Sequence, residues 1–274
     1  MSLKGKLNFI GLTDTGKVRP HNEDAIGTDL DVGLVVLADG MGGYKAGEVA
    51  SALAIKTVTE TVSAGIKEAR KMKSTESGYA PETVLLRNAV AKANKVINET
   101  AKNQPQCEGM GTTIVACMYY DNKVSIAHVG DSRLYRLRRD QFEQVTLDHS
   151  LLQELVSRGF YTPEEARKSL NKNLVTRALG IEPTVQVDVQ EDVMLVGDIH
   201  LLCSDGLSDM VEDADIHLTI STFNANLDMA AQQLVRMAND NGGRDNISVV
   251  LAQAAKSFET KKGLLNRFFN EWFG

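Results

Sequence analysis

Two long amphipathic segments constrain the fold of this chain more than any other feature of its sequence. Residues 46–69 and 82–102 carry apolar side chains at helical spacing, with charged side chains on the opposite faces. Short runs of β-branched and apolar residues precede and follow this pair, with connections of hairpin length. Separate groups of strands and helices are typical of α+β proteins with antiparallel sheets, rather than of a parallel doubly wound sheet. We therefore expect an α+β fold in which residues 1–255 form one domain.

Strands are expected on both sides of the helical pair. Three of them precede it, at residues 6–12, at residues 34–38 and in a short piece between those two. Residues 112–145 have the pattern of an antiparallel meander, with strands at 112–120, 123–129, 132–137 and 142–145. Further strands are expected at 185–189, 199–203 and 246–254, and a helix at 226–239. The second half of the chain is therefore expected to be rich in strands.

The composition is that of an ordinary soluble globular protein: of 274 residues, 43% are apolar and 24% are charged. The formal net charge of −6 argues against nucleic acid as a partner and suits a protein that concentrates carboxylates at one site. Three cysteines without metal-ligand spacing indicate reduced thiols rather than a zinc site or a disulfide framework. We find no signal peptide and no membrane-spanning run, so we expect a cytoplasmic protein.

Five aspartates lie near the ends of expected strands, most of them beside glycine or another turn-forming residue. They are Asp24, Asp39, Asp131, Asp205 and Asp245. Each alone has an ordinary interpretation as a solvated turn residue. Five together would repel one another unless cations neutralise them, and carboxylate oxygens suit Mg²⁺ or Mn²⁺. The sequence contains no set of histidines and cysteines that would favour a softer metal.

Asp39 stands in the most informative setting of the five. The pattern of a buried strand at residues 34–38 stops at this aspartate, and Gly40, Gly42 and Gly43 follow it closely. Glycines let the backbone turn sharply and approach a ligand closely. A simple Asp-Gly turn is the alternative interpretation.

Six short motifs occur in a fixed order along the chain. They are Arg19-x-x-Asn-Glu-Asp24, Asp39-Gly-Met-Gly-Gly43, Gly111-Thr-Thr113, Gly130-Asp-Ser-Arg133, Ser204-Asp-Gly-Leu207 and Asp245-Asn246. Together they resemble the motifs of the metal-dependent type 2C serine/threonine protein phosphatases, in their bacterial form, over residues 8–254. The resemblance implies a four-layer α-β-β-α sandwich of two antiparallel sheets flanked by helices, with a two-metal centre at one end.

The resemblance also implies a set of metal ligands. Asp39 would bridge two ions, either Mn²⁺ or Mg²⁺, and the carbonyl group of Gly40 would help to bind one of them. Asp205 and Asp245 would bind the other ion, and Asp24 would act mainly through metal-bound water. The implied cofactor is therefore two divalent cations per chain.

A weaker third metal and a phosphate site are implied as well. Asp131, together with Asp205, resembles the position of the third metal, and Arg19 resembles the arginine that binds phosphate. An ion pair with a neighbouring carboxylate is the alternative role of Arg19. A metal-activated water would attack phosphorus in line, with Arg19, Asp24 and Asp39 as the expected catalytic residues.

Two positions depart from the family pattern. Animal relatives carry a histidine as the proposed general acid where this chain has Met41, and many bacterial relatives have histidine at the position of Tyr44. Tyr44 and a metal-bound water are the alternatives for protonating the leaving alkoxide. Ser132 and Ser204 are expected to support the site rather than to act as nucleophiles.

Two further segments carry expectations of their own. Residues 147–180 resemble the family's flap beside the active site, with Thr176 and Arg177 as the expected contacts with the cleft; an ordinary surface excursion is the alternative. The tail at 256–274 is expected to dock on its own domain or on a neighbour's, while membrane attachment or a partner's groove are alternatives. Its large apolar residues at helical spacing are Leu264, Leu265, Phe268, Phe269, Trp272 and Phe273.

The sequence therefore predicts an Mn²⁺- or Mg²⁺-dependent enzyme that removes phosphate from serine and threonine residues of proteins. Its expected partners are phosphorylated proteins, namely a bacterial serine/threonine kinase and the substrates of that kinase. One alternative is a pseudo-phosphatase that binds phosphoproteins without turnover, against which the complete set of acids argues. Another is a metal-dependent phosphodiesterase or nuclease, which the acidic net charge disfavours.

Overall fold

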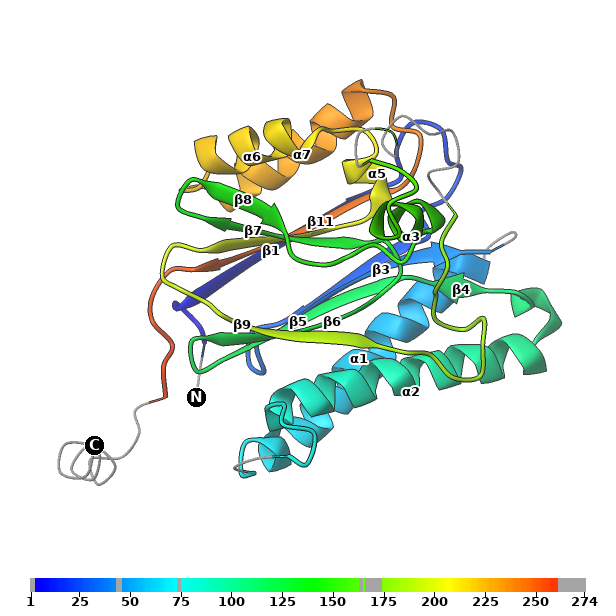
Figure 1. The fold of residues 1–274 in the computed structure, drawn as a ribbon, viewed down its shortest axis with the longest axis horizontal. Helices are drawn as coiled ribbons and strands as arrows, with labels where there is room; N and C mark the ends of the chain where they lie inside the picture. The colour runs from blue at the N-terminus through cyan, green and yellow to red at the C-terminus, as the bar shows by residue number, and fades with distance from the viewer. Residues whose placement is uncertain (1–2, 43–45, 73–74, 163–164, 166–173, 261–274) are drawn as a thin grey trace.

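Two antiparallel sheets lie face to face, and helices cover the outer face of each sheet (Figure 1). This computed structural model describes residues 3–42, 46–72, 75–162, 165 and 174–260. The five-stranded sheet has the order β1-β11-β10-β7-β8, and the six-stranded sheet has the order β2-β3-β5-β6-β9 with β4 paired to β3. The four-layer α+β sandwich predicted from the sequence is confirmed.

The strands are short and follow the predicted ranges closely over most of the chain. The five-stranded sheet consists of β1 (Leu7–Asp14), β7 (Arg133–Arg138), β8 (Gln141–Gln144), β10 (Ile199–Cys203) and β11 (Ile247–Ala254). The six-stranded sheet consists of β2 (Asp24–Asp29), β3 (Leu34–Met41), β4 (Gly111–Thr112), β5 (Ile114–Tyr120), β6 (Lys123–Val129) and β9 (Asp188–Val193). Only β9 differs clearly, because it begins later than the strand predicted at 185–189.

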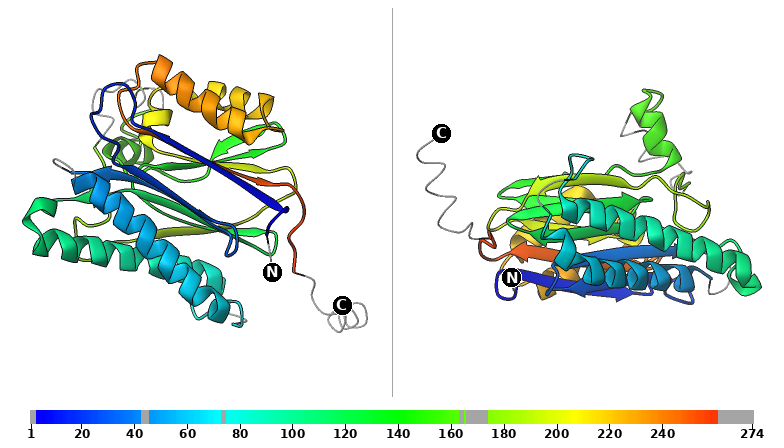
Figure 2. Two further views of the ribbon diagram at one scale, coloured as in Figure 1. Left: turned by 180° about the vertical axis from the view of Figure 1, so that it is seen from behind. Right: turned by 90° about the horizontal axis from the view of Figure 1, so that it is seen from below.

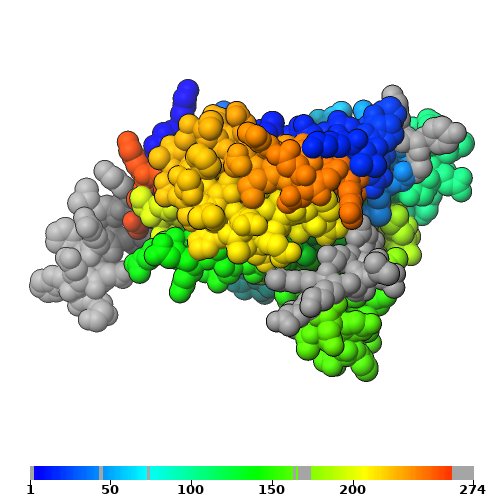
Figure 3. Space-filling view, turned by 90° about the horizontal axis from the view of Figure 1, so that it is seen from above, coloured from blue at the N-terminus to red at the C-terminus, as the bar shows by residue number. Residues whose placement is uncertain are grey.

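Helices α1 (Ala46–Ala69) and α2 (Pro81–Asn103) cover the six-stranded sheet and agree with the two predicted amphipathic helices. A short 3-10 helix (Pro105–Cys107) follows α2. Helices α6 (Asp213–Thr222) and α7 (Leu227–Asp240) cover the five-stranded sheet, as the space-filling view in Figure 3 shows.

Two other helices lie at the end of the sandwich that carries the motifs. Helix α5 (Asp205–Ser208) directly follows β10, and α3 (Leu151–Ser157) projects from the body of the molecule (Figures 2 and 3). No helix in the part of the chain that the structure describes combines the length and the apolar character of a bilayer-spanning segment.

Strand β3 shows why the runs of apolar sequence are continuous rather than alternating. Val36 and Ala38 face α1 and α2, whereas Val35 and Leu37 face the opposite sheet. All four side chains are fully buried. A strand between a helical layer and a second sheet has no face in contact with water, so both of its faces are apolar.

The predicted meander over residues 112–145 is wrong. Strands β5 and β6 belong to the six-stranded sheet, while β7 and β8 belong to the five-stranded one. The chain crosses between the sheets after β6, at Gly130, whose φ of +107° favours glycine. Sequence periodicity reports that each strand exists but not which sheet it joins. The crossing has a consequence for the site, because it places Asp131 between the two sheets.

Helix α6 was not predicted. Only Ile216 and Ile220 form its buried apolar stripe, so its amphipathic pattern is weak in the sequence. Tyr44 and the tail beyond Thr260 lie outside the described residues.

Candidate metal centre

The register of β2 and β3 places Asp24 directly opposite Asp39. Side chains of directly opposed residues in an antiparallel pair lie on the same face of the sheet, about 5 Å apart at Cβ. Two carboxylates are thus brought together by strand pairing alone. The sequence indicated both residues separately, but only the register makes them neighbours.

Asp24 is buried and only partly satisfied. Its Oδ2 atom accepts a hydrogen bond from Ser204 Oγ at 2.8 Å, while its Oδ1 atom is buried without a hydrogen-bond partner. Burial is the main reason that the pKa of Asp24 rises to about 6. The Ser204 hydroxyl also accepts the backbone N–H of Ser248 at 3.0 Å, which confirms a supporting role for this serine. A buried carboxylate oxygen without a donor fits a bound cation.

Three more carboxylates come from the other sheet and from the crossing between the sheets. Asp205 begins α5, Asp245 lies just before β11, and Asp131 follows Gly130. Burial raises the pKa of Asp39 well above its usual value, and the nearby charges of Asp24, Asp205, Asp131 and Asp245 raise it further. All five predicted aspartates therefore lie close enough to repel one another.

Burial and neighbouring charges also raise the pKa values of Asp205 and Asp131. The pKa of Asp205 is raised strongly by burial and then by Asp131 and Asp245. Burial and the neighbouring charge of Asp148 raise the pKa of Asp131 to about 6. Carboxylates held against their mutual repulsion are a preorganised site for divalent cations.

The backbone beside Asp39 is tightly enclosed. The N–H of Gly40 donates to the carbonyl oxygen of Glu23 at 3.1 Å, and a Cβ atom on Gly40 would overlap backbone atoms of Glu23 and Gly47. The carbonyl oxygen of Asp39 accepts the Thr112 hydroxyl and the Thr113 N–H, each at 2.8 Å. Position 40 therefore requires glycine. The backbone around Asp39 is fixed by hydrogen bonds to Glu23 on one side and from Thr112 and Thr113 on the other.

Asn246 belongs to one of the six motifs, but the sequence did not indicate its role. It lies buried at the start of β11, where its Nδ2 atom donates to the carbonyl oxygens of Thr15 and His21, both at 2.9 Å. Its Oδ1 atom accepts the N–H of Glu23 at 2.8 Å. One amide thus fixes the loop that carries Arg19. The only sequence signal was its place after Asp245, where an asparagine also suits a turn.

Arg19 forms the ion pair that was the alternative to a phosphate role. Its Nη2 atom donates to Asp245 Oδ2 at 2.6 Å, and this hydrogen bond is the main reason that the pKa of Arg19 is raised. The guanidinium side chain remains 49% exposed. It can therefore hold Asp245 and still present donors to solvent.

A second cluster ties the predicted flap to the six-stranded sheet. His149 Nδ1 accepts the N–H of Gly130 at 3.0 Å, and His149 Nε2 lies 3.2 Å from Asp188 Oδ2. Arg177 Nη1 donates to Asp188 Oδ1 at 2.8 Å. Arg177 therefore contacts strand β9, not the cleft as predicted, and Thr176 is exposed.

This flap cluster resembles a metal site only in its residue types. Within the described residues, His128, His149 and Asp188 form the one group of three whose ligand atoms lie within 4.8 Å of one another, which the sequence did not predict. The guanidinium of Arg177 already supplies the positive charge there. His149 Nδ1 accepts the N–H of Gly130, and its Nε2 atom lies beside Asp188 and Arg177. We interpret the cluster as the anchor of the flap. The carboxylate groups of the five aspartates are hard oxygen ligands, which suit Mg²⁺ or Mn²⁺ better than this cluster does.

Clustered carboxylates between two stacked antiparallel sheets define the class of protein, a metal-dependent hydrolase. The family described as Protein phosphatase 2C matches residues 17–251. The serine/threonine phosphatase stp of Listeria innocua is 38% identical over 246 residues, which are 88% of this chain and 93% of that protein.

Solved structures agree with the sequence comparison. The crystal structure of the Mycobacterium tuberculosis serine/threonine phosphatase PstP/Ppp is similar with a TM-score of 0.81 and 36% identity, covering 91% of this chain and 99% of that one. A crystal structure of the PstP catalytic domain in complex with two manganese ions gives a TM-score of 0.76 and 35% identity, over 91% of this chain and 99% of that one. The chain belongs to the protein phosphatase 2C family, and it is a metal-dependent serine/threonine protein phosphatase.

Proposed function

We propose that this chain hydrolyses phosphoserine and phosphothreonine in proteins at the carboxylate centre between its sheets. The observation that carries the proposal is the convergence of four other aspartates on buried Asp39, each of which raises its pKa, together with a buried oxygen of Asp24 that has no hydrogen-bond partner. The ligands of the two main ions would be Asp39, Asp205 and Asp245, with Asp24 acting mainly through metal-bound water. The Gly40 carbonyl group would add one further oxygen.

The position of each residue supports a division of roles. Asp39, which all the other acids influence, would be shared between the two metals. Asp205 and Asp245 would hold one ion from the five-stranded sheet, and Asp131 with Asp205 would hold a weaker third. Bound Mn²⁺ or Mg²⁺ supplies Lewis-acid stabilisation of the phosphoryl oxygens and lowers the pKa of attacking water.

The protein's own groups would orient the substrate. Arg19 is proposed to bind the phosphate, because its exposed guanidinium offers a fork of donors and its ion pair with Asp245 holds it beside the metal ligands. Asp24 would accept hydrogen bonds from water on the substrate side, while Ser204 fixes its other oxygen. Met41 ends β3 and has no proton to give, so the donor to the leaving group is left to Tyr44 or to water.

We also propose the organisation and the setting of the enzyme. Residues 1–255 would be the catalytic domain, with a flap at 147–180, and residues 256–274 would be a separate tail. A serine/threonine kinase and its phosphorylated substrates are the proposed partners. The cytoplasm is the proposed location, which three free and buried cysteines support.

Metal dependence on a defined substrate tests this proposal. We expect a phosphothreonine peptide to be hydrolysed with Mn²⁺ or Mg²⁺, and at least about 10³-fold more slowly in EDTA, because the metals supply several kcal/mol of transition-state stabilisation. A phosphodiester such as bis-p-nitrophenyl phosphate serves as the control substrate and should react far more slowly. Rapid turnover in EDTA, or preference for the diester, would contradict the proposal.

The flap anchor gives a second test. Arg177→Ala should lower kcat/KM for the peptide about tenfold while changing turnover of p-nitrophenyl phosphate less than about twofold. The reason is that a flap no longer bound to Asp188 would position a peptide poorly, whereas a small aryl phosphate does not depend on the flap. The matched control is Arg158→Ala, whose side chain is 70% exposed and forms an ion pair with Glu154 on α3. Equal losses on both substrates would show that Arg177 acts on the centre itself, not through the flap.

A further inference from the structure

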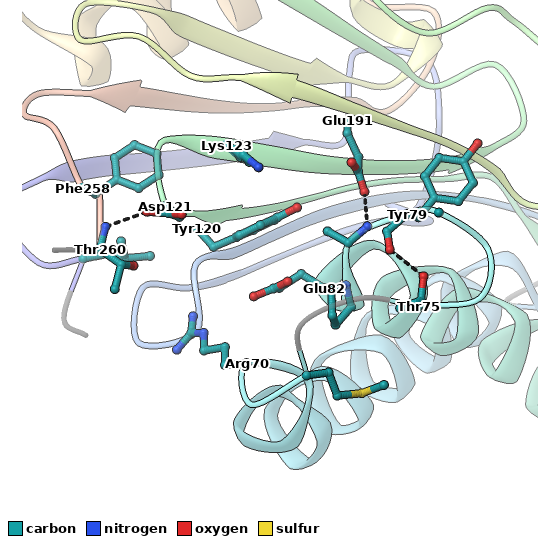
Figure 4. A pocket seen from close by; sticks show the side chains of 15 residues that line it. Arg70, Thr75, Tyr79, Glu82, Tyr120, Asp121, Lys123, Glu191, Phe258 and Thr260 are labelled. Atoms are coloured by element: carbon teal, nitrogen blue, oxygen red, sulfur yellow. Dashed lines mark hydrogen bonds between the residues drawn. The ribbon is translucent and has the colours of Figure 1, made fainter. Parts of the chain in front are cut away.

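A hollow of about 680 Å³ opens beside the β5–β6 turn and the α1–α2 connection (Figure 4). Figure 1 shows these segments at the end of the sandwich opposite α5, which Asp205 begins. Its walls come from Leu3, the connection from α1 to α2, the start of α2, the β5–β6 turn, β9 and the chain that follows β11. Its volume lies within the range of about 300–1,000 Å³ that is typical of ligand pockets. The proposed reaction uses none of these residues.

The hollow combines exposed apolar side chains with charges of both signs. Met72 is 56% exposed and Tyr79 is 38% exposed, and both line the hollow, so they offer apolar surface within it. Glu82 and Glu191 line the side of α2 and β9, and Lys123 lies at the start of β6 (Figure 4). Such a surface suits a segment that is both apolar and charged, rather than a purely apolar ligand.

The chain itself is fixed at the rim of the hollow. Phe258 is buried between the sheets, and its N–H donates to Asn122 Oδ1 at 2.7 Å. The N–H of Thr260 donates to Asp121 Oδ1 at 2.6 Å, as Figure 4 shows. Thr260, the last described residue, therefore lies at the edge of the hollow, so the segment 261–274 is attached directly beside it.

The sequence of that segment matches the walls. Its charge is net positive, because Lys261, Lys262 and Arg267 outnumber Glu271. The lining of the hollow is net negative, because Glu82, Asp121 and Glu191 outnumber Arg70 and Lys123. Its apolar residues recur at helical spacing and would form a single stripe. They are Leu264, Leu265, Phe268, Phe269, Trp272 and Phe273.

We propose that residues 261–274 dock in this hollow as an amphipathic helix of the same chain. The apolar stripe would cover Met72 and Tyr79, and the basic residues would face Glu82 and Glu191. The immediate attachment at Thr260 favours the chain's own segment over a second copy, because a tethered segment is present at a high effective concentration. The contact ties the α1–α2 connection to the C-terminal segment, away from the metal centre.

The chain offers a direct probe, because Trp272 is its only tryptophan. We expect Trp272 emission in the full chain to be blue-shifted and protected from acrylamide, without lipid and independently of protein concentration. In the double variant Met72→Asp, Tyr79→Asp, the emission should shift to the red and the quenching constant should rise about threefold, since a buried indole becomes exposed. Unchanged hydrolysis of p-nitrophenyl phosphate would show that the double variant is folded.

Leu218→Asp is the matched control, because Leu218 is 65% exposed on α6 and lies outside the hollow. It should leave the emission of Trp272 unchanged. Three results would each overturn the proposal. They are a solvent-exposed Trp272 in the unaltered chain, a blue shift that requires higher protein concentration, and a blue shift that requires vesicles containing anionic lipid.

Discussion

Replacing Asp39 with asparagine should abolish phosphatase activity and, at the same time, make the metal-free protein more stable at neutral pH. Asp39 is the carboxylate that the other four acids influence, and it is the proposed bridge between the metals. Loss of about 4 kcal/mol of transition-state stabilisation corresponds to a fall of about 10³-fold in kcat. We expect turnover of both the peptide and p-nitrophenyl phosphate to fall by at least that factor.

The stability of Asp39→Asn separates a metal site from a merely structural carboxylate. Without metal, the neutral amide removes like-charge repulsion at a buried position, and each unit by which a pKa is raised corresponds to about 1.4 kcal/mol. The melting temperature in EDTA should therefore rise by several degrees. Addition of Mn²⁺ should stabilise the variant less than it stabilises the unaltered chain.

Asp31→Asn is the matched control for that experiment. Asp31 is exposed in the turn between β2 and β3, so the same change of charge should leave turnover and the manganese-induced gain in stability unaltered. An active Asp39→Asn variant would contradict the proposed bridging role. So would a variant that is less stable than the unaltered chain in EDTA.

The second large effect is a stabilisation by manganese that grows as the pH rises. The pKa values of Asp24 and Asp131 are raised to about 6 in the folded chain, and those of Asp39 and Asp205 are raised strongly. The folded chain thus binds more protons than the unfolded chain above about pH 4, so the free energy of unfolding falls as the pH rises through the folded pKa values. Raising one pKa by about two units corresponds to about 3 kcal/mol.

Buried histidines change the free energy of unfolding with pH in the opposite direction. Their contribution must therefore be separated from that of the carboxylates. Burial lowers the pKa of His128 and His149, and it lowers the pKa of His200 to about 4. These groups make the folded chain gain stability as the pH rises toward about 6.5, their usual pKa. Because they contribute equally with and without metal, the difference between melting temperatures in Mn²⁺ and in EDTA isolates the carboxylates.

We therefore expect the manganese-induced rise in melting temperature to be small at pH 5 and several times larger at pH 7.5. Divalent cations replace the protons that neutralise the acids at low pH, and they stabilise the folded chain by binding it preferentially. Thermal unfolding at both pH values, with and without Mn²⁺, measures this directly. A gain that is the same at pH 5 and pH 7.5 would contradict a binding site made of these aspartates.

Much of the candidate site could be predicted because its residue types carry the chemistry. Aspartates at strand ends are hard oxygen ligands wherever they meet, and their order along the chain carried the family resemblance. The role of Asn246 could not be predicted, since its three hydrogen bonds reach residues that lie far away in sequence. For the same reason, Arg177 was expected at the cleft but binds Asp188 on β9.

The sequence by itself determined the local elements and the kind of centre. Helical and strand periodicities come from neighbouring residues, so α1, α2 and most strands followed from them. Only the tertiary structure decided the crossing at Gly130, which sends β7 and β8 to the other sheet, and the register that sets Asp24 opposite Asp39. These outcomes depend on which apolar faces pack together and which distant backbone groups pair, and no local pattern encodes either choice.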